Sequence, residues 1–153
     1  MQYKSIVCRV TGSEQGQKAA MEAALLAQRD NAKLTYVFAV DTTFLRKGFA
    51  VSLSHGTAEE SLERIGEVIL RSMDRIASSH GMTPKKVIRR GSVPEVVKSV
   101  ILEEKADLLV VEHEKRTFFE RVFSRGTVED HAQELKQQTG VMIDVVTGYY
   151  QAA

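Results

Sequence analysis

Two short segments contain the residue types that bind phosphate. Thr11, Gly12 and Ser13 follow an apolar run, and Gly126 and Thr127 precede a stretch with helical periodicity. Glycine at the start of a helix lets backbone N–H groups approach an anion, which the positive end of the helix dipole attracts. Gly126 and Thr127 therefore suggest a site for one anion, although Thr127-Val128-Glu129-Asp130 also fits a plain capping box, and Ser13 can cap the helix that follows it.

The sequence lacks the residue patterns that a metal site or a hydrolytic active site would require. His55, His80, His113 and His131 have no metal-ligand spacing, and one cysteine cannot build a zinc site. Ser13 lacks the glycine-framed turn of a hydrolase nucleophile. We expect no catalytic residues and no metal, and we keep His113 with His131 as a candidate functional pair.

Composition narrows the class of protein. The 153 residues predict one domain over 1–153, and 21 Lys+Arg against 20 Asp+Glu give a formal charge of +1. No global charge favours nucleic acid or an acidic membrane, and no apolar stretch is long enough to span a bilayer. Cys8 lies in an apolar run, where a thiol acts as a small hydrophobe. We expect a cytoplasmic protein with neither nucleic-acid nor membrane partners.

The elements that must position these segments alternate between strands and helices. Apolar runs predict strands at 4–10, 34–40, 85–90, 107–111 and 141–146; helical periodicity, capping residues and Pro94 predict helices at 14–29, 58–80, 94–105 and 127–139. The order predicts an α/β fold with a five-stranded, mainly parallel sheet between two helical layers, a three-layer sandwich of the Rossmann-like class. Ligands of such sheets bind at the carboxyl ends of the strands, near a topological switch point.

Five segments in this order resemble the universal stress protein family. They are Ile6-Val7-Cys8-Arg9-Val10-Thr11-Gly12-Ser13, residues 34–41, Gly91-Ser92-Val93-Pro94-Glu95, Ala106-Asp107-Leu108-Leu109-Val110-Val111 and Gly126-Thr127-Val128. The resemblance implies an adenine nucleotide alpha hydrolase-like fold. It also implies a homodimer that pairs through the last strand, with Val141, Ile143 and Val145 as candidate interface residues.

Some family members bind ATP and others do not. The resemblance implies ATP or AMP as the ligand class and a candidate site made of Val10, Thr11, Gly12, Ala39, Val40, Glu112, Lys115, Arg116, Arg125, Gly126, Thr127 and Val128. ATP binders typically have an aspartate after the first strand and a G-x-x-G-x9-G-[S/T] loop after the fourth.

This sequence departs from the ATP-binding pattern. Thr11 stands at the aspartate position, and Glu112 and Lys115 stand where the early glycines would fall. The spacing from Glu112 to Gly126 is one residue too long. A carboxylate a few ångströms from a triphosphate adds about 1–4 kcal/mol of repulsion, depending on the local dielectric.

Three hypotheses follow for function. The first is a regulatory stress protein, not an enzyme, in which ATP binding is weak or absent. The second is an ATP-binding member, or slow ATPase, in which Arg116, Arg121 or Arg125 replaces the glycine cradle. The third is an interaction module that uses the 114–125 loop, where Phe118, Phe119 and Phe123 lie among charged residues. In that loop the phenylalanines also fit a short amphipathic turn packed on the sheet.

Overall fold

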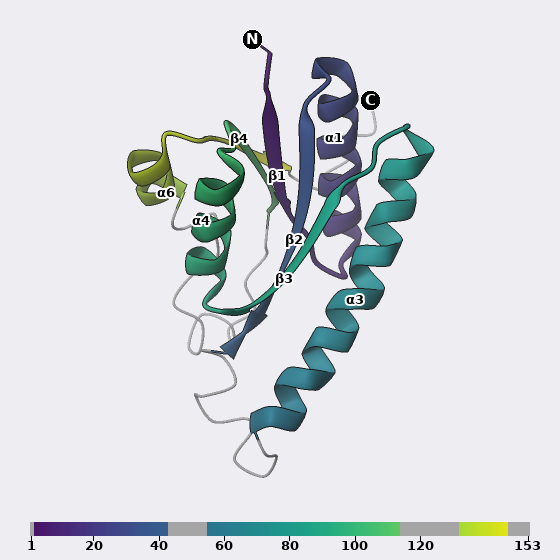
Figure 1. Ribbon diagram of the computed structural model, residues 1–153, viewed down its shortest axis with the longest axis vertical. Coiled ribbons are helices and arrows are strands. Elements are labelled where there is room, and N and C mark those ends of the chain that lie inside the picture. Colours follow the sequence, from purple (N-terminus) through teal and green to yellow (C-terminus); the bar gives the residue numbers. More distant parts are fainter. Residues whose placement is uncertain (1, 43–54, 114–131, 147–153) are drawn as a thin grey trace.

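The structure, a computed structural model, describes residues 2–42, 55–113 and 132–146. Strands and helices alternate along the chain (Figure 1). The elements are β1 (Ser5–Arg9), α1 (Glu14–Asp30), β2 (Lys33–Asp41), α3 (His55–Ser79), β3 (Lys85–Gly91), α4 (Val93–Glu104), β4 (Leu108–Glu112), α6 (Ala132–Thr139) and β5 (Met142–Val146). This order confirms the α/β class predicted from the sequence.

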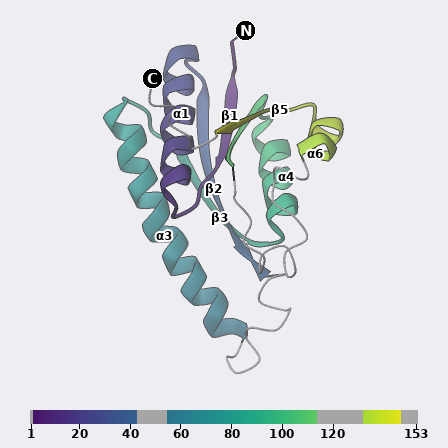
Figure 2. The same cartoon turned by 180° about the vertical axis from the view of Figure 1, so that it is seen from behind.

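The five strands form one parallel sheet in the order β3-β2-β1-β4-β5. Helices α1 and α3 cover one face, and α4 and α6 cover the other (Figures 1 and 2). The chain moves outward from β1 in both directions, so the topological switch point lies between β1 and β4. That seam is where a ligand site is expected.

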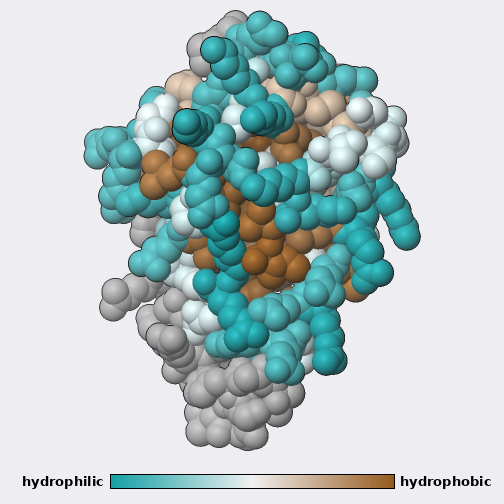
Figure 3. Space-filling model, viewed as in Figure 1, coloured by the Kyte–Doolittle hydropathy of each residue, from teal (hydrophilic) through white to brown (hydrophobic). Residues whose placement is uncertain are grey.

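Each face of the sheet has its own apolar core. Alternate residues of β1 illustrate the division: Ile6 and Cys8 pack toward α1 and α3, while Val7 packs toward α4. In Figure 3 apolar side chains gather in the middle of the face seen there, over the sheet between α4 and α3, within a hydrophilic surround. No helix in the described part of the chain is long and apolar enough to cross a membrane.

Helix α1 packs closely on the sheet because its inner face is made of small residues. Five alanines of this helix are fully buried: Ala19, Ala20, Ala23, Ala24 and Ala27. The side chain of Ser13 caps the helix as predicted and accepts a 2.9 Å hydrogen bond from the Gly16 backbone N–H. Met21 and Leu25, although at helical spacing with the alanines, are 45% and 44% exposed, so they lie outside this core.

Helix α3 starts at His55, three residues before the predicted position. Its buried stripe includes Leu70, Met73 and Ala77, whereas Ile65 is 51% exposed. Gly66 is more than a passive helix residue. A Cβ at this position would lie 2.4 Å from Phe38 Cδ1 on β2, so the missing side chain permits the close helix–sheet approach.

Strand β3 is an edge strand of the described sheet, and its four cations are all paired. Lys85 and Arg89 pair with Glu104 and Glu103 of α4; Lys86 pairs with Asp74, and Arg90 with Glu59 and Glu63, all on α3. Basic side chains protect an edge strand from pairing with another strand. The position of this basic cluster on the edge strand fits that protective role.

Two aspartates secure the amino-terminal end of the sheet. Asp107 accepts hydrogen bonds from the backbone N–H groups of Lys4 and Ser5 at 2.9 and 3.0 Å. Asp30 accepts one from the Tyr3 backbone N–H at 2.9 Å and forms an ion pair with Arg29. Both contacts hold β1 to elements distant in sequence.

Gly66→Ala is expected to lower stability. Alanine improves helix propensity by up to about 1 kcal/mol, but the added methyl group must displace the Phe38 ring, and such overpacking costs about 1–3 kcal/mol. Urea unfolding should give a lower free energy of unfolding for the variant. In the double variant with Phe38→Ala the two losses should be less than additive; full additivity would show that the contact is unimportant.

Stability should fall in acid partly through Asp30. Hydrogen bonds from Arg29 and from the Tyr3 backbone lower the pKa of Asp30 to about 2, below its unfolded value of about 3.9. The stabilisation is complete above the unfolded pKa and is lost as the pH falls through the folded pKa. Asp30→Asn should therefore be less stable than the parent near neutrality, and the two should converge near pH 2. Urea titrations at several pH values test this, with Glu14→Gln as the control that should not reproduce the convergence.

Candidate functional site

The carboxyl ends of β1 and β4 meet at the switch point and bring Thr11 beside Glu112. The two strands are paired in register through Ile6↔Leu108, Val7↔Leu109 and Cys8↔Val110. Strand β1 ends at Arg9, so the turn that begins α1 lies over the last residue of β4. Residues about a hundred positions apart in sequence are thereby neighbours.

The Glu112 carboxylate is held by two hydroxyl groups. Thr11 Oγ1 donates to Glu112 Oε1, and Ser13 Oγ donates to Glu112 Oε2. Glu112 is only 6% exposed. A buried charge needs hydrogen-bond partners to offset the loss of hydration, and the two hydroxyls supply them.

Ser13 and Gly16 connect this cluster to α1. The Ser13 hydroxyl donates to Glu112 and accepts from the Gly16 backbone N–H, so one side chain links the carboxylate to the first turn of the helix. A Cβ at Gly16 would lie 2.4 Å from Thr11 Oγ1 and 2.8 Å from the Thr11 carbonyl oxygen. Gly16 thus makes room for the Thr11 hydroxyl. We name Thr11, Ser13 and Glu112 the carboxylate clamp.

Ser13 and Gly16 are not among the candidate nucleotide-site residues that the family resemblance implies. Glycine inside a helix is unfavourable and suggests a packing requirement, and this is the sequence signal that marks Gly16. Glu112, predicted as the first loop residue, is instead the last residue of β4. Its backbone is therefore fixed by the sheet, where it pairs with Val146 of β5.

The other predicted residues fall into two groups. Val10 and Val40 are buried at the ends of β1 and β2, and Ala39 precedes Val40 in β2; Gly12 lies beside Ile69 of α3. The second group lies outside the described residues and consists of Lys115, Arg116, Arg125, Gly126, Thr127 and Val128, together with the 114–125 loop and His131. The described half of the predicted site thus lies at the carboxyl ends of the adjacent strands β2, β1 and β4.

Cys8 is a core residue. It is fully buried, and its pKa is raised chiefly by burial and secondarily by the charge of Glu112. A thiol that resists ionisation is a poor nucleophile, which agrees with its predicted structural role. Within the described ranges no group of three or more His, Cys, Asp or Glu residues is placed to hold a metal ion.

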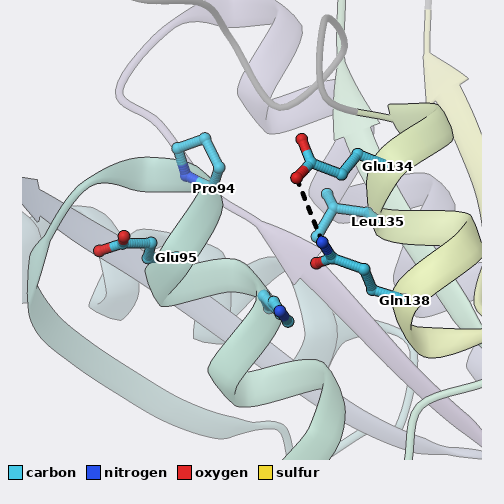
Figure 4. Close-up of a pocket in the computed structure, with 6 residues that line it drawn as sticks. Pro94, Glu95, Glu134, Leu135 and Gln138 are labelled. Atoms are coloured by element: carbon cyan, nitrogen blue, oxygen red, sulfur yellow. Dashed lines mark hydrogen bonds between the residues drawn. The ribbon is translucent and has the colours of Figure 1, made fainter.

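A hollow lies away from the clamp, between α4 and α6. Its volume is about 190 Å³, and Figure 4 shows Pro94 and Glu95 of α4 across from Glu134, Leu135 and Gln138 of α6. Gln138 Nε2 donates to Glu134 Oε1 at 3.1 Å. Drug-sized ligand sites usually span about 300–1,000 Å³, so this hollow is too small to replace the switch point as the candidate site.

Solved structures with this architecture include two nucleotide complexes. The universal stress protein UspA from Lactobacillus plantarum is 18% identical, with a TM-score of 0.72 over 95% of this chain and 99% of that one. A universal stress protein in complex with cAMP is 20% identical, with a TM-score of 0.68 over 97% and 100%. A universal stress protein from Archaeoglobus fulgidus in complex with dAMP is 14% identical, with a TM-score of 0.56 over 95% and 99%. At these identities the likeness establishes the fold.

Fold and switch-point site together define a protein of the Rossmann-like α/β class, with its polar cluster at the carboxyl edge of a parallel sheet. The sequence profile of the universal stress protein family matches residues 2–139. The chain belongs to the universal stress protein family, as the resemblance implied. No curated protein matches the sequence.

Thr11→Val should destabilise the protein through the clamp. The substitution removes one donor from a buried carboxylate, and a hydrogen bond to a charged group is worth about 1.5–3 kcal/mol. Urea unfolding should show a loss of this size. In a Glu112→Gln background the loss should shrink, because a neutral amide needs the donor less; an equal loss in both backgrounds would mean that Thr11 acts independently of Glu112.

Proposed function

We propose that this chain is a regulatory universal stress protein that acts by binding rather than catalysis, as a homodimer, with weak affinity for ATP. The observation that carries the proposal is the buried Glu112 carboxylate at the switch point. The family fold is suited to a nucleotide at this place. The local charge of this chain opposes a triphosphate there.

We expect weak ATP binding because a carboxylate at this place repels phosphate and because it replaces a glycine of the family's phosphate loop. Glu112 occupies the first glycine position of the family's phosphate loop, and its carboxylate lies between Thr11 and the start of α1. At a few ångströms the repulsion from a phosphate is worth about 1–4 kcal/mol, depending on the effective dielectric constant. AMP has fewer charges than ATP and should be disfavoured less. The cAMP and dAMP complexes of two relatives support the monophosphate class as the better candidate.

A specific feature of the clamp favours a second candidate, an ATP-binding member with a rewired site. ATP-binding relatives place a carboxylate after the first strand, at the position of Thr11. Here a carboxylate reaches the same β1–β4 seam from β4 and contacts Thr11 directly. In that case Glu112 would substitute for the missing aspartate and assist nucleotide binding. The two candidates predict opposite effects of neutralising Glu112.

Dimerisation through β5 is supported by the contrast between the two edges of the described sheet. Edge strand β3 has four paired cations, whereas β5 has a single charged residue, Asp144. Ile143 and Val145 are half-buried within the single chain. The Val141 side chain is fully buried in the chain's own core, so the candidate interface reduces to Ile143, Val145 and the strand backbone. An apolar edge without protective charges favours pairing with a second strand.

Glu112→Gln is expected to tighten ATP binding. The amide preserves the size of the side chain and removes its charge, so affinity for ATP should rise by tenfold or more, a change of about 1.4 kcal/mol or above. AMP should gain less. Isothermal titration of the parent and the variant with both nucleotides measures the change.

Glu104→Gln is the matched control, since it makes the same charge change at the opposite end of the sheet, where Glu104 pairs with Lys85. Its ATP affinity should equal that of the parent. Sub-micromolar ATP affinity in the parent would contradict weak binding. Weaker binding by Glu112→Gln would favour the rewired-site candidate instead.

A further inference from the structure

The two hydroxyl groups of the turn between β1 and α1 use their hydrogens inside the protein. Thr11 Oγ1 donates to Glu112 Oε1, and Ser13 Oγ donates to Glu112 Oε2. A hydroxyl group has one hydrogen to donate, although its oxygen can accept hydrogen bonds in addition. While Glu112 is held in this way, neither side chain can donate to a ligand at the carboxyl edge of the sheet.

The start of α1 fixes the position of both donors. The Ser13 oxygen accepts a 2.9 Å hydrogen bond from the Gly16 backbone N–H, so its hydrogen points away from that group. Thr11 Oγ1 lies 3.0 Å from Ser13 Oγ, in the space that the missing side chain of Gly16 leaves open. The hydroxyls therefore form a pair of adjacent donors.

The Glu112 carboxylate binds this pair as a ligand anion would. It presents one oxygen to each hydroxyl, and it is buried at the end of β4. A phosphate group also presents neighbouring oxygens, and protein donors recognise carboxylate and phosphate oxygens in the same paired manner. Glu112 is thus the equivalent, within the chain, of one phosphate group of a ligand.

The contact can open without movement of the strand. Glu112 pairs with Val146 of β5, and the backbone N–H of His113 donates to the Val146 carbonyl oxygen at 2.9 Å. The sheet therefore fixes the backbone of Glu112, whereas the side chain retains its own rotatable bonds. Rotation of this side chain is sufficient to release both hydroxyls.

We propose that Glu112 is an autoinhibitory group, which occupies the Thr11 and Ser13 donors that would otherwise bind one phosphate group of a nucleotide. This rests on the nucleotide site of the proposed function and adds occupancy of the donors to the charge repulsion argued there. The two effects differ in their dependence on the ligand. Repulsion grows with the charge of the ligand, whereas occupancy of two donors weakens AMP and ATP by the same factor.

Glu112→Gln and Glu112→Ala separate the two effects. Glutamine removes the charge, but its amide can still accept from one hydroxyl and donate to the other; alanine removes charge and contact together. From Gln to Ala the affinities for AMP and for ATP should each rise by about tenfold or more, because a hydrogen bond to a charged group is worth at least that factor. Isothermal titration of the full chain with each nucleotide measures both gains.

Variants that remove one donor test whether alanine acts only by making room. In a Thr11→Val or a Ser13→Ala background the gain from Gln to Ala at position 112 should shrink, because a single hydroxyl is left to release. Thr11→Ser keeps a hydroxyl and should retain the full gain. Glu104→Gln and Glu104→Ala, at the opposite end of the sheet, should both bind AMP and ATP as the parent does.

The outcomes for this inference and for the proposed function are separate. Equal affinities of Glu112→Gln and Glu112→Ala, or a gain that neither background reduces, overturn autoinhibition and leave the charge effect in place. Tight ATP binding by the parent contradicts the proposed weak affinity, whereas a further gain in Glu112→Ala would still support occupancy. Absence of nucleotide binding in every variant overturns both.

A folding defect in one variant does not prevent the comparison. Urea unfolding identifies the variants that are folded. Glu112→Gly also removes the contact and serves as the second variant beside Glu112→Ala. Thr11→Val and Ser13→Ala are independent backgrounds, so either one is sufficient for the test of the donors.

Discussion

The burial of the Glu112 carboxylate at the β1–β4 seam is the constraint on which the site depends. A parallel sheet covered on both faces leaves little water at the ends of its central strands, so a carboxylate there needs donors from the protein. Thr11 and Ser13 provide them, and Ser13 is also the cap of α1. Gly16 must lack a side chain for Thr11 to fit. The start of α1, the end of β1 and the end of β4 are thus specified together, and a change in any one of them affects the other two.

The fold was predictable from the sequence because each of its signals is local. Apolar runs, the Ser13 cap and Pro94 placed every described strand and helix within a few residues. Features that depend on neighbours in space could not be predicted from the sequence. Met21 and Leu25 lie at helical spacing with the α1 alanines, yet they are exposed while the alanines are buried. The role of Gly66 depends on Phe38 of β2, which a Cβ at that position would contact.

The candidate site was only half predictable for the same reason. Thr11 and Glu112 were recognised separately, as departures from a family pattern. Their mutual hydrogen bond depends on the register of β1 against β4, which periodicity does not report. Ser13 was seen as a helix cap, and its second bond to Glu112 needs the same register. The motif shows only that the family's aspartate and early glycines are missing. The structure shows that hydrogen bonds from Thr11 and Ser13 to Glu112 are formed at this place.

A formal net charge of +1 conceals an uneven distribution of charged groups over the sheet. The cations of β3 are paired with carboxylates of α3 and α4, which leaves that edge polar and self-contained. The Glu112 carboxylate at the end of β4 has a different environment, because two hydroxyl groups hold it. Hydroxyls are neutral donors, so they add no positive charge that would attract a phosphate. A carboxylate paired with a cation and a carboxylate held by hydroxyls thus present different surfaces to a ligand, because the donor differs.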